Sequence, residues 1–517
     1  MASSVNTPLG FDIEKTPPFL AFRILRNRAI EYCGESNVLD LSQGEPGYGF
    51  APNVRSREFY AFLLLLDVEF NNNETEAHFA NLPEKDLPRI LGRIQKVAHE
   101  NYIPEKAEKV LRDFGIFVDT LLKVTKEQKM KFEKFDILYD ILKYAIPSGG
   151  RYPNPWGEPL VRAATANAYR HLLGIDVEND DIMLISGASH GIGTVFKSLG
   201  EEGIGFLQKG DLMLITSPVY APYNKIIEDR GIKVFSLSVD PETGKVAPKS
   251  LEELSHVSER IKAMVLINPN NPTGFPYGDD LLSAIGKAAE KHNSLIITDE
   301  VYLQFFDQAK SILSLPSTRK RTIYISSISK TERATGIRFG VFLLLKEARE
   351  YISQNILGKD VLREFQDIQW LLYMAKSPGG KTLGAFQHIT GIPGPSQILG
   401  LCHIILGGEE RKKYFADLRK KVKIFYETLG MKHQGNCYYG MFDMKNLESP
   451  EKSKLSVEQK YAEIAERGVV LMPGNLFFSE EDRAKKDCTS YFRVSLPNLS
   501  FENTKKAAEI LRKYLSE

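Results

Sequence analysis

The chain has 517 residues, of which 43% are hydrophobic and 26% are charged. Because a single hydrophobic core stops growing beyond roughly 250–300 residues, this length predicts more than one domain. The 67 basic and 66 acidic residues almost cancel. This balance leaves no surplus of positive charge for binding nucleic acid or an anionic membrane. It favours a function that involves small molecules.

The first part of the chain predicts an N-terminal segment followed by a helical insertion. We expect residues 1–56 to form that segment together with part of a small domain. Residues 57–145 are charged and carry apolar side chains at helical spacing, namely Leu87, Ile90, Leu91, Ile94 and Val97. Such a stripe marks the buried face of an amphipathic helix. We therefore predict that the insertion packs on the body of the protein or on a partner subunit.

Between residues 180 and 345, short apolar runs alternate with longer mixed segments of helical character, such as residues 279–292. The runs cover residues 181–185, 211–215, 263–267, 295–298, 322–325 and 341–345. Continuously apolar runs of this length are typical of strands buried on both faces. We predict an α/β fold with a mostly parallel central sheet, in a large domain of residues 146–395. In such sheets, ligands gather at the carboxyl ends of the strands.

A break in regular structure is expected at residues 391–395, Gly-Ile-Pro-Gly-Pro, because proline and glycine interrupt helices and strands. A long helical pattern follows this predicted hinge. We predict that residues 396–517 form a linking helix and a C-terminal α/β domain that is smaller than the first. No internal repeat or low-complexity segment stands out in the sequence.

The cysteines and the apolar runs exclude several kinds of protein. The chain has neither CxxC pairs nor clusters of cysteine with histidine, and its four cysteines are Cys33, Cys402, Cys437 and Cys488. We therefore expect no disulfide framework and no metal site, and a reducing cytoplasm fits. The first ten residues lack the basic and apolar regions of a leader, and the apolar runs are too short to span a bilayer. We expect a cytoplasmic protein without membrane or nucleic-acid partners.

The motif richest in chemistry runs from residue 327 to residue 340 and has the sequence SISKTERATGIRFG. A lysine amine such as that of Lys330 can form a Schiff base with an aldehyde, while hydroxyl groups and an arginine fork can hold a phosphate. Ser327, Ser329 and Arg338 supply those groups. The motif therefore predicts an anchor for pyridoxal 5'-phosphate, an aldehyde that carries a phosphate. A solvated surface lysine is the alternative for any lysine considered alone.

Two further polar motifs follow predicted strands. Residues 268–274, NPNNPTG, form a rigid turn after one strand, and Asp299 and Tyr302 of the segment TDEVY follow the next. Each motif has a structural alternative, a plain turn for the first and a helix cap for the second. Their order along the chain, with Lys330 after a further strand, favours one shared site.

These three motifs, in this order, resemble those of the fold-type I pyridoxal-phosphate enzymes of the class I/II aminotransferase family. The resemblance covers most of the chain from about residue 41 onward, with the helical insertion excepted. It implies that Lys330 forms an aldimine with the cofactor and that Asp299 pairs with the pyridine nitrogen. It also implies that Asn271 and Tyr302 hydrogen-bond the phenolic oxygen. An ionised acid at the ring nitrogen keeps that nitrogen protonated, so the ring can act as an electron sink.

The same resemblance implies a phosphate cradle. The segment SGASHG, residues 186–191, offers backbone amides at a predicted helix N-terminus. The residues that would hold the phosphate are Gly187, Ala188, Ser189, Ser327 and Arg338. Tyr220 matches the aromatic residue that stacks on the cofactor ring, with a core tyrosine as the alternative. Tyr152 matches the residue that reaches a neighbouring subunit's phosphate, which implies a homodimer or a higher homo-oligomer.

The substrate is expected at Arg493. This arginine lies in an apolar run, where an unpaired guanidinium is costly, and a substrate α-carboxylate is the natural partner. The resemblance adds Gly44 as a backbone contact to that carboxylate and Asn271 as a second substrate-binding residue. The sequence does not name the side chain of the substrate.

Together these residues predict an aminotransferase that moves an amino group from an L-amino acid to a 2-oxo acid through a quinonoid intermediate. The predicted catalytic residues are Lys330, the general base, together with Asp299 and Tyr220. The insertion, the pattern Gly44-x-Pro46-x-Tyr48 and residues 388–397 are also similar to bacterial aspartate 4-decarboxylases, which makes a pyridoxal-phosphate lyase the alternative. Gln43 stands where their signature has an arginine, so we rank the aminotransferase first. A non-catalytic binding protein on this fold ranks last.

Overall fold

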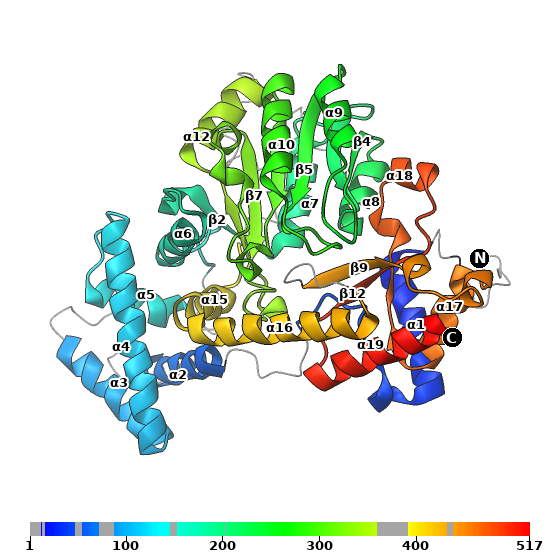
Figure 1. Cartoon of the computed structure of the whole chain (residues 1–517). Coiled ribbons are helices and arrows are strands. Elements are labelled where there is room, and N and C mark those ends of the chain that lie inside the picture. The colour runs from blue at the N-terminus through cyan, green and yellow to red at the C-terminus, as the bar shows by residue number, and fades with distance from the viewer. Residues whose placement is uncertain are drawn as a thin grey trace. The chain divides into compact units, whose positions relative to one another are not determined.

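The computed structural model describes residues 12, 16–46, 54–71, 87–144, 152–201, 203–358, 391–431 and 438–517. Tyr48 and residues 388–390, which contribute to the similarity with lyases, lie outside this range. The chain divides into two compact units, each built from segments that are distant in the sequence (Figure 1). Unit 1 consists of Met1–Phe50, Gly205–Thr322 and Lys413–Glu517, and unit 2 of Ala51–Ile204 and Ile323–Lys412.

Unit 1 contains a parallel sheet with the strand order β6-β5-β3-β4. Its strands are β3 (Leu212–Ser217), β4 (Lys233–Ser238), β5 (Ile261–Ile267) and β6 (Leu295–Asp299). The connecting helices are α8 (Ala221–Asp229), α9 (Pro248–His256) and α10 (Asp279–His292), and α11 (Pro316–Arg319) follows β6. Helices α9 and α10 pack beside β4 and β5 (Figure 1). The strands are parallel, so their carboxyl ends share one edge of the sheet.

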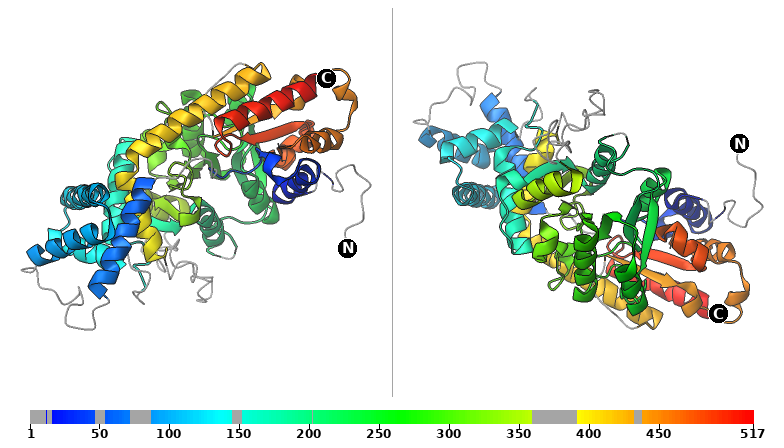
Figure 2. Two further views of the ribbon diagram at one scale, coloured as in Figure 1. Left: turned by 90° about the horizontal axis from the view of Figure 1, so that it is seen from below. Right: turned by 90° about the horizontal axis from the view of Figure 1, so that it is seen from above.

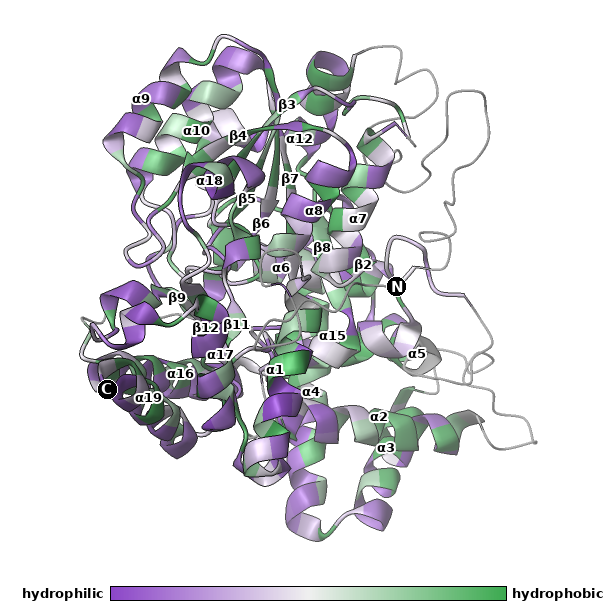
Figure 3. Cartoon of the chain, turned by 90° about the vertical axis from the view of Figure 1, so that its right-hand side faces the viewer, coloured by the Kyte–Doolittle hydropathy of each residue, from purple (hydrophilic) through white to green (hydrophobic). Residues whose placement is uncertain are grey.

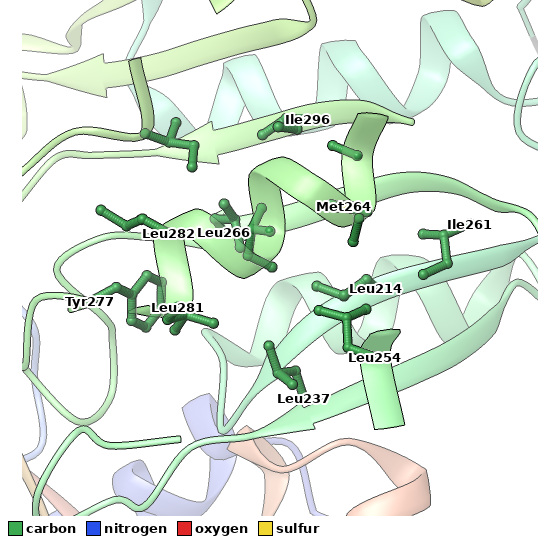
Figure 4. Packing of buried hydrophobic residues seen from close by; sticks show 14 of the residues in the cluster. Leu214, Leu237, Leu254, Ile261, Met264, Leu266, Tyr277, Leu281, Leu282 and Ile296 are labelled. Atoms are coloured by element: carbon green, nitrogen blue, oxygen red, sulfur yellow. The ribbon is translucent and has the colours of Figure 1, made fainter. Parts of the chain in front are cut away.

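The core of this sheet is a cluster of aliphatic side chains. Figure 4 shows Leu281 and Leu282 of α10 lying against Leu266 of β5, and all three are buried. Helix α10 carries hydrophobic and hydrophilic residues on different sides (Figure 3), as expected for a helix that covers a sheet with one face only. Its predicted bounds, residues 279–292, are confirmed.

Unit 1 also contains two smaller sheets. The strands β11 (Met472–Pro473), β12 (Tyr491–Ser495) and β9 (Tyr439–Asp443) pair antiparallel in that order, and β1 (Leu39–Asp40) pairs parallel with β10 (Val469–Val470). The accompanying helices are α1 (Pro18–Cys33), α17 (Val457–Glu466), α18 (Glu480–Lys485) and α19 (Phe501–Ser516). In Figure 1 the blue helix α1 lies beside the orange helix α17, although the two are far apart in the sequence.

Unit 2 contains β2 (Ile182–Ser186), β8 (Phe339–Leu343) and β7 (Thr322–Ser327), whose first residue belongs to unit 1. Strand β8 lies between the other two and runs antiparallel to both, with Ser186 opposite Phe339 and Ser327 opposite Gly340. The start of β8 therefore lies at the same edge as the ends of β2 and β7. Arg338, just before β8, is placed at that edge.

The other long elements of unit 2, within the described ranges, are helices. They are α2 (Val54–Asn71), α3 (Leu87–Asn101), α4 (Pro104–Glu127), α5 (Lys134–Tyr144), α6 (Pro159–Leu173), α7 (Ala188–Leu199), α12 (Lys346–Tyr351) and α15 (Gly394–Leu406). Helix α16 (Gly408–Leu429) begins in this unit. The blue and cyan helices α2, α3 and α4 lie side by side in both views of Figure 2.

The apolar stripe expected in the insertion is buried at Ile90, Ile94 and Val97 and half-buried at Leu87 and Leu91. A partly buried ion pair connects α2 to α4, with Arg55 Nε 3.0 Å from Asp113 Oδ1. The Asp113 carboxylate is the largest cause of the raised pKa of Arg55. Burial of one helix face, rather than propensity alone, stabilises such a helical region.

The predicted α/β class and the mostly parallel central sheet are confirmed. Each of the six predicted apolar runs overlaps one of the strands β2, β3, β5, β6, β7 and β8. Strand β4 was not predicted, because most of its residues are half-buried or exposed and no continuous apolar run marks it. Among the described residues, no helix is both long enough and apolar enough to cross a membrane.

Candidate functional site

The predicted site residues fall into two groups, one in each unit. Unit 1 contains Gly44, Tyr220, Asn271, Asp299, Tyr302 and Arg493, and unit 2 contains Tyr152, Gly187, Ala188, Ser189, Ser327, Lys330 and Arg338. Each group has its own network of contacts. Among the described residues, no cluster of three or more histidine, cysteine, aspartate or glutamate side chains could hold a metal ion.

Arg338 is the cation of the unit 2 group. Its Nη1 donates to the carbonyl oxygen of Thr335 at 2.8 Å, and its Nη2 donates to that of Ser186 at 3.2 Å. Its backbone is left-handed, with φ of 60°. Within the described part of the chain Arg338 forms no ion pair, so two carbonyl dipoles hold a full positive charge at the edge where β2 and β7 end. Such a charge suits an anion.

Gly187 lies directly against this guanidinium. Its φ of 79° and ψ of 161° belong to a region that only glycine adopts readily. A Cβ added at Gly187 would lie 2.2 Å from Arg338 Nη2, and one added at Gly340 would lie 2.7 Å from the Gly187 Cα atom. Gly187 is also the N-cap of the 12-residue helix α7. The two glycines therefore bring backbone amides of a helix N-terminus close to Arg338, an arrangement that favours a phosphate.

We expect Gly187→Ala to lower the free energy of unfolding of the cofactor-free protein by about 1–3 kcal/mol, the cost of a strained backbone conformation. Gly193→Ala, in the same helix, is the matched control, because nothing lies within 4 Å of its added Cβ. It should raise that free energy by about 0.5–1 kcal/mol, since alanine favours a helix interior. Urea unfolding measures both. Equal stability of the two variants would mean that Arg338 does not occupy the space beside Gly187.

The end of β7 leads into a tight turn that contains Lys330. Ser327 Oγ lies 2.7 Å from Ser329 Oγ and accepts the Ser329 backbone N–H at 3.0 Å. The Lys330 carbonyl accepts the N–H of Arg333 at 3.4 Å. Just after Lys330, the buried carboxylate of Glu332 pairs with the Arg411 guanidinium. These contacts fix the backbone on both sides of the half-buried Lys330.

His190 belongs to the unit 2 group and was not assigned a role from the sequence. The backbone N–H of Ser186 donates to His190 Nδ1 at 3.2 Å. Burial lowers the pKa of His190, and the charge of Arg338 lowers it further. The imidazole is therefore neutral near pH 7 and serves as an acceptor that holds the start of the Gly187 turn. A histidine three residues after a glycine is too common a pattern to have revealed this.

Three other residues of the unit 2 group face outward to different degrees. Tyr152 is 79% exposed, Ser189 is exposed and Ala188 is half-buried. An aromatic side chain as exposed as Tyr152 is free to reach a neighbouring molecule. Its contact with a partner subunit stays a prediction.

In unit 1, the structure separates the roles of the three asparagines in NPNNPTG. Asn270 Nδ2 donates to the Pro218 carbonyl at 3.1 Å and to Tyr277 Oη at 2.9 Å. Asn268 Nδ2 donates to the Lys310 carbonyl at 2.8 Å. Both therefore brace the turn. Asn271 Oδ1 instead accepts from Arg493 Nη1 at 3.3 Å, which joins it to the predicted substrate residue.

Arg493, on β12, is only 4% exposed. Besides Asn271, its guanidinium donates from Nη2 to the Ser42 carbonyl at 2.6 Å, and it lies 4.4 Å from the centre of the Tyr439 ring and 5.1 Å from that of Phe477. Among the described residues, no atom accepts a hydrogen bond from its Nε, and no carboxylate forms an ion pair with it. A buried guanidinium in this state is well suited to bind a carboxylate from outside the chain.

Two tyrosines connect Gly44 and Tyr302 to the surroundings of Arg493. Neither tyrosine was assigned a role from the sequence. Tyr438 Oη donates to the Gly44 carbonyl at 3.1 Å, and Tyr302 Oη donates to Tyr439 Oη at 3.2 Å. Burial raises the pKa of Tyr302 well above its usual value, and the neighbouring tyrosines raise it further. Tyr302 therefore keeps its proton and remains a hydrogen-bond donor throughout the neutral range.

Asp299 is the last residue of β6 and is 5% exposed. Its Oδ1 accepts the backbone N–H of Val301 at 3.3 Å. Burial raises the pKa of Tyr223 well above its usual value, and the charges of Asp299 and Tyr220 add to the shift. The Tyr220 ring packs edge-on against that of Tyr223, with 6.4 Å between ring centres. A buried acid and two tyrosines thus gather at the carboxyl edge of the parallel sheet.

Comparison with known proteins gives one family. The model for the aminotransferases of class I and II matches residues 123–511. The chain is 30% identical over 203 residues to an aspartate aminotransferase of Pyrococcus horikoshii, and 28% identical over 195 residues to one of Geobacillus stearothermophilus. These matches cover 38% and 37% of this chain and 49% and 47% of the relatives. The chain thus spans about half the length of these curated relatives.

A third relative matches along nearly its whole length. The chain is 25% identical over 520 residues, 94% of itself and 93% of the relative, to a bifunctional aspartate aminotransferase and L-aspartate β-decarboxylase from a Pseudomonas species. Among solved structures, a mutant aspartate aminotransferase of Thermus thermophilus is similar with a TM-score of 0.60, 18% identity and 97% coverage of both chains. A methionine aminotransferase of Escherichia coli has a TM-score of 0.60, 17% identity and coverage of 95% and 96%. At these identities the structures show the fold alone.

Proposed function

The chain belongs to the class I and II aminotransferase family, and on this premise we propose that it moves an amino group from an L-amino acid to a 2-oxo acid with pyridoxal 5'-phosphate as cofactor. The observation that carries the proposal is Arg493. Arg493 is buried, and among the described residues no carboxylate pairs with its guanidinium and no atom accepts a hydrogen bond from its Nε. The α-carboxylate that amino acids and 2-oxo acids share would supply the missing charge and the missing acceptor.

The residues present fit the cofactor. Its phosphate suits the helix N-terminus at Gly187 and the Arg338 guanidinium, which two carbonyl groups hold without a counter-charge from the described residues. A Cβ at position 187 would fill the space beside that guanidinium. The buried Asp299 suits a protonated ring nitrogen. When bound, pyridoxal phosphate supplies an aldehyde for the amino group and a ring that withdraws electrons from the substrate's α-carbon.

The chain's own residues then have separate tasks. Lys330 would hold the cofactor through its amine and, once that amine is free, would move the proton that leaves the α-carbon. Asp299 holds a proton at the ring nitrogen. Tyr302, which keeps its own proton, would donate a hydrogen bond to the ring's oxygen in place of Tyr439 Oη, its acceptor in this structure, and Arg493 would bind and orient the α-carboxylate. Asn271 keeps the Arg493 guanidinium in place.

The direct test is to incubate the protein and added pyridoxal phosphate with single L-amino acids and 2-oxoglutarate, and to measure products by mass spectrometry. We expect a new 2-oxo acid and an equal amount of glutamate from at least one donor. Arg493→Lys is the matched variant, because lysine keeps the positive charge but lacks the planar guanidinium that can form two parallel hydrogen bonds to a carboxylate. We expect it to raise KM by about 10- to 100-fold, the worth of one or two charge-assisted hydrogen bonds. Absence of glutamate with every donor would refute the proposal.

Aspartate β-decarboxylation is a second candidate, favoured by the near full-length match to the Pseudomonas relative. Against it stands Gln43, whose Nε2 lies 3.3 Å from Asp40 Oδ2 and which brings no positive charge for a second carboxylate. Alanine and carbon dioxide formed from aspartate, with little glutamate, would place this activity first.

We further propose that the enzyme is cytoplasmic and acts as a homodimer or a higher homo-oligomer, in which the exposed Tyr152 reaches the neighbouring subunit's phosphate. Its domains would be those expected from the sequence, a large domain of residues 146–395 and a smaller C-terminal domain of residues 396–517, with 57–145 as an insertion. Sedimentation of the wild type against Tyr152→Phe, together with cofactor affinity, tests the role of Tyr152.

A further inference from the structure

The dipeptide Tyr438-Tyr439 at the start of β9 touches three residues of the unit 1 group at once. These are Gly44, Tyr302 and Arg493, which come from three separate parts of the sequence. Both tyrosines are buried, with 2% of each exposed. Neither tyrosine has a task in the proposed chemistry, so that chemistry does not explain why they contact these three residues.

Tyr439 makes a different kind of contact with each of the three. The face of its ring lies under the Arg493 guanidinium, 4.4 Å from Cζ to ring centre, which is a cation–π contact. Its Oη accepts from Tyr302 Oη at 3.2 Å. The same Oη would lie 2.2 Å from a Cβ on Gly44. Only a glycine fits there as long as the hydroxyl is present.

Tyr438 holds the other side of the same loop. Its Oη donates to the Gly44 carbonyl at 3.1 Å, and its ring centre lies 5.3 Å from that of Tyr302. The loop is also held by Arg493, which donates to the Ser42 carbonyl. The segment around Gly44 is thus held by Tyr438, which immediately precedes β9, and by Arg493 on β12.

We propose that Tyr439 is a positioning residue that sets three things together: the plane of the Arg493 guanidinium, the direction of the Tyr302 hydroxyl and the position of the Gly44 loop. This rests on the proposed function, in which Arg493 and Gly44 take the substrate's carboxylate and Tyr302 meets the cofactor's oxygen. The Tyr439 phenol would then connect the residues that bind the substrate's carboxylate to the residue that contacts the cofactor's phenolic oxygen. In this structure Tyr302 gives its one O–H to Tyr439 Oη. For Tyr302 to donate to the cofactor's oxygen, that bond must reverse, so that Tyr439 donates to Tyr302 Oη. Tyr302 is then a better donor, because hydrogen bonds in a chain strengthen one another.

A compensating pair of substitutions tests the contact with Gly44. Gly44→Ala should weaken binding of the non-reacting carboxylates maleate and 3-phenylpropionate to the cofactor-bound protein by about tenfold, equivalent to 1.4 kcal/mol. In Gly44→Ala/Tyr439→Phe the nearest ring atom, Cζ, would lie 3.2 Å from the new Cβ, a distance that a small shift relieves. Binding should return to within about threefold of Tyr439→Phe alone, since contacting residues are not additive. A double variant as weak as Gly44→Ala would overturn the proposal.

The same four proteins are compared by urea unfolding without cofactor, which makes the test independent of the proposed function. If neither carboxylate binds the wild type, the proposed function fails, and the unfolding data alone decide whether Tyr439 and Gly44 are coupled. Rescue of the stability lost in Gly44→Ala by the second substitution supports the coupling. Additive losses oppose it.

A spectroscopic readout distinguishes positioning from simple packing. Tyr439→Phe keeps the ring under Arg493 but removes the hydroxyl beside Tyr302. We expect the pH midpoint of the bound cofactor's visible absorbance to rise by about half a unit, because a weaker donor at the ring's oxygen stabilises the deprotonated form less. Tyr439→Leu should also weaken carboxylate binding by about fivefold through loss of the cation–π contact. An unchanged midpoint in Tyr439→Phe would contradict the link to Tyr302.

Discussion

Replacing Lys330 with alanine is expected to lower turnover by at least about 10⁴-fold, the upper end of what a positioned general base contributes. In the proposed mechanism, the substitution removes both the amine that binds the cofactor and the base that moves the α-proton. The turn around Lys330 is held by other residues, namely Ser327, Ser329 and the buried pair Glu332–Arg411. The fold should therefore survive, and the loss should be chemical.

Two measurements check this result. Borohydride reduction followed by peptide mass spectrometry should find the cofactor on the peptide that contains Lys330 in the wild type, and on no peptide in the variant. Added methylamine should restore part of the activity, because a small free amine can replace the missing base. Lys249→Ala serves as the control, since that side chain is 85% exposed. Cofactor on a different lysine would refute the assignment.

Asp299→Asn is expected to lower kcat by about 10²- to 10³-fold, the range seen when one preorganised electrostatic contact is removed. The amide keeps the size of the carboxylate and can still accept the Val301 N–H. It cannot keep the ring nitrogen protonated, so the electron sink weakens while substrate binding does not. We therefore expect KM to change little. A loss confined to KM would contradict the role given to Asp299.

The neighbouring acid, Glu300, provides the matched control for Asp299. It is 1% exposed, and burial raises its pKa to about 8. At pH 7 it is mostly protonated, so Glu300→Gln replaces one neutral group by another and should leave kcat nearly unchanged. In the wild type the folded state holds this proton more tightly than the unfolded state, so stability falls as pH rises from about 4.5 to about 8. That fall should be smaller in Glu300→Gln.

The sequence was sufficient for the strands that are buried on both faces, because continuous burial leaves a continuous apolar run. It was insufficient for β4, most of whose side chains are half-buried or exposed, and for the direction of β8. A fully buried strand looks the same whether it runs parallel or antiparallel to its neighbours. The antiparallel direction matters, because it brings Arg338, before β8, to the edge where β2 and β7 end.

The candidate site shows a similar division. Motif order alone placed Asn271 in the prediction, but Asn268 and Asn270 are chemically identical to it, and only their partners reveal that they brace the turn. The role proposed for Tyr439 depends on a contact with Gly44, almost four hundred residues away in the chain. Local patterns carry no information about such a contact. Lys330 was easier to find because its supporting residues are its sequence neighbours.

The pairing of β1 with β10 has a consequence for the way the chain is made. Leu39 pairs with Val469, and Ala21 and Leu25 of α1 are buried in the finished unit. At a synthesis rate of about 5–20 residues per second, the ribosome needs roughly 20 to 90 seconds to reach Val469 after it has made Leu39. During that interval the early helix has apolar residues and no strand partner. The newly made N-terminal segment cannot pair with β10 until Val469 has been made. We therefore expect a chaperone that binds nascent chains to cover its apolar residues during that interval.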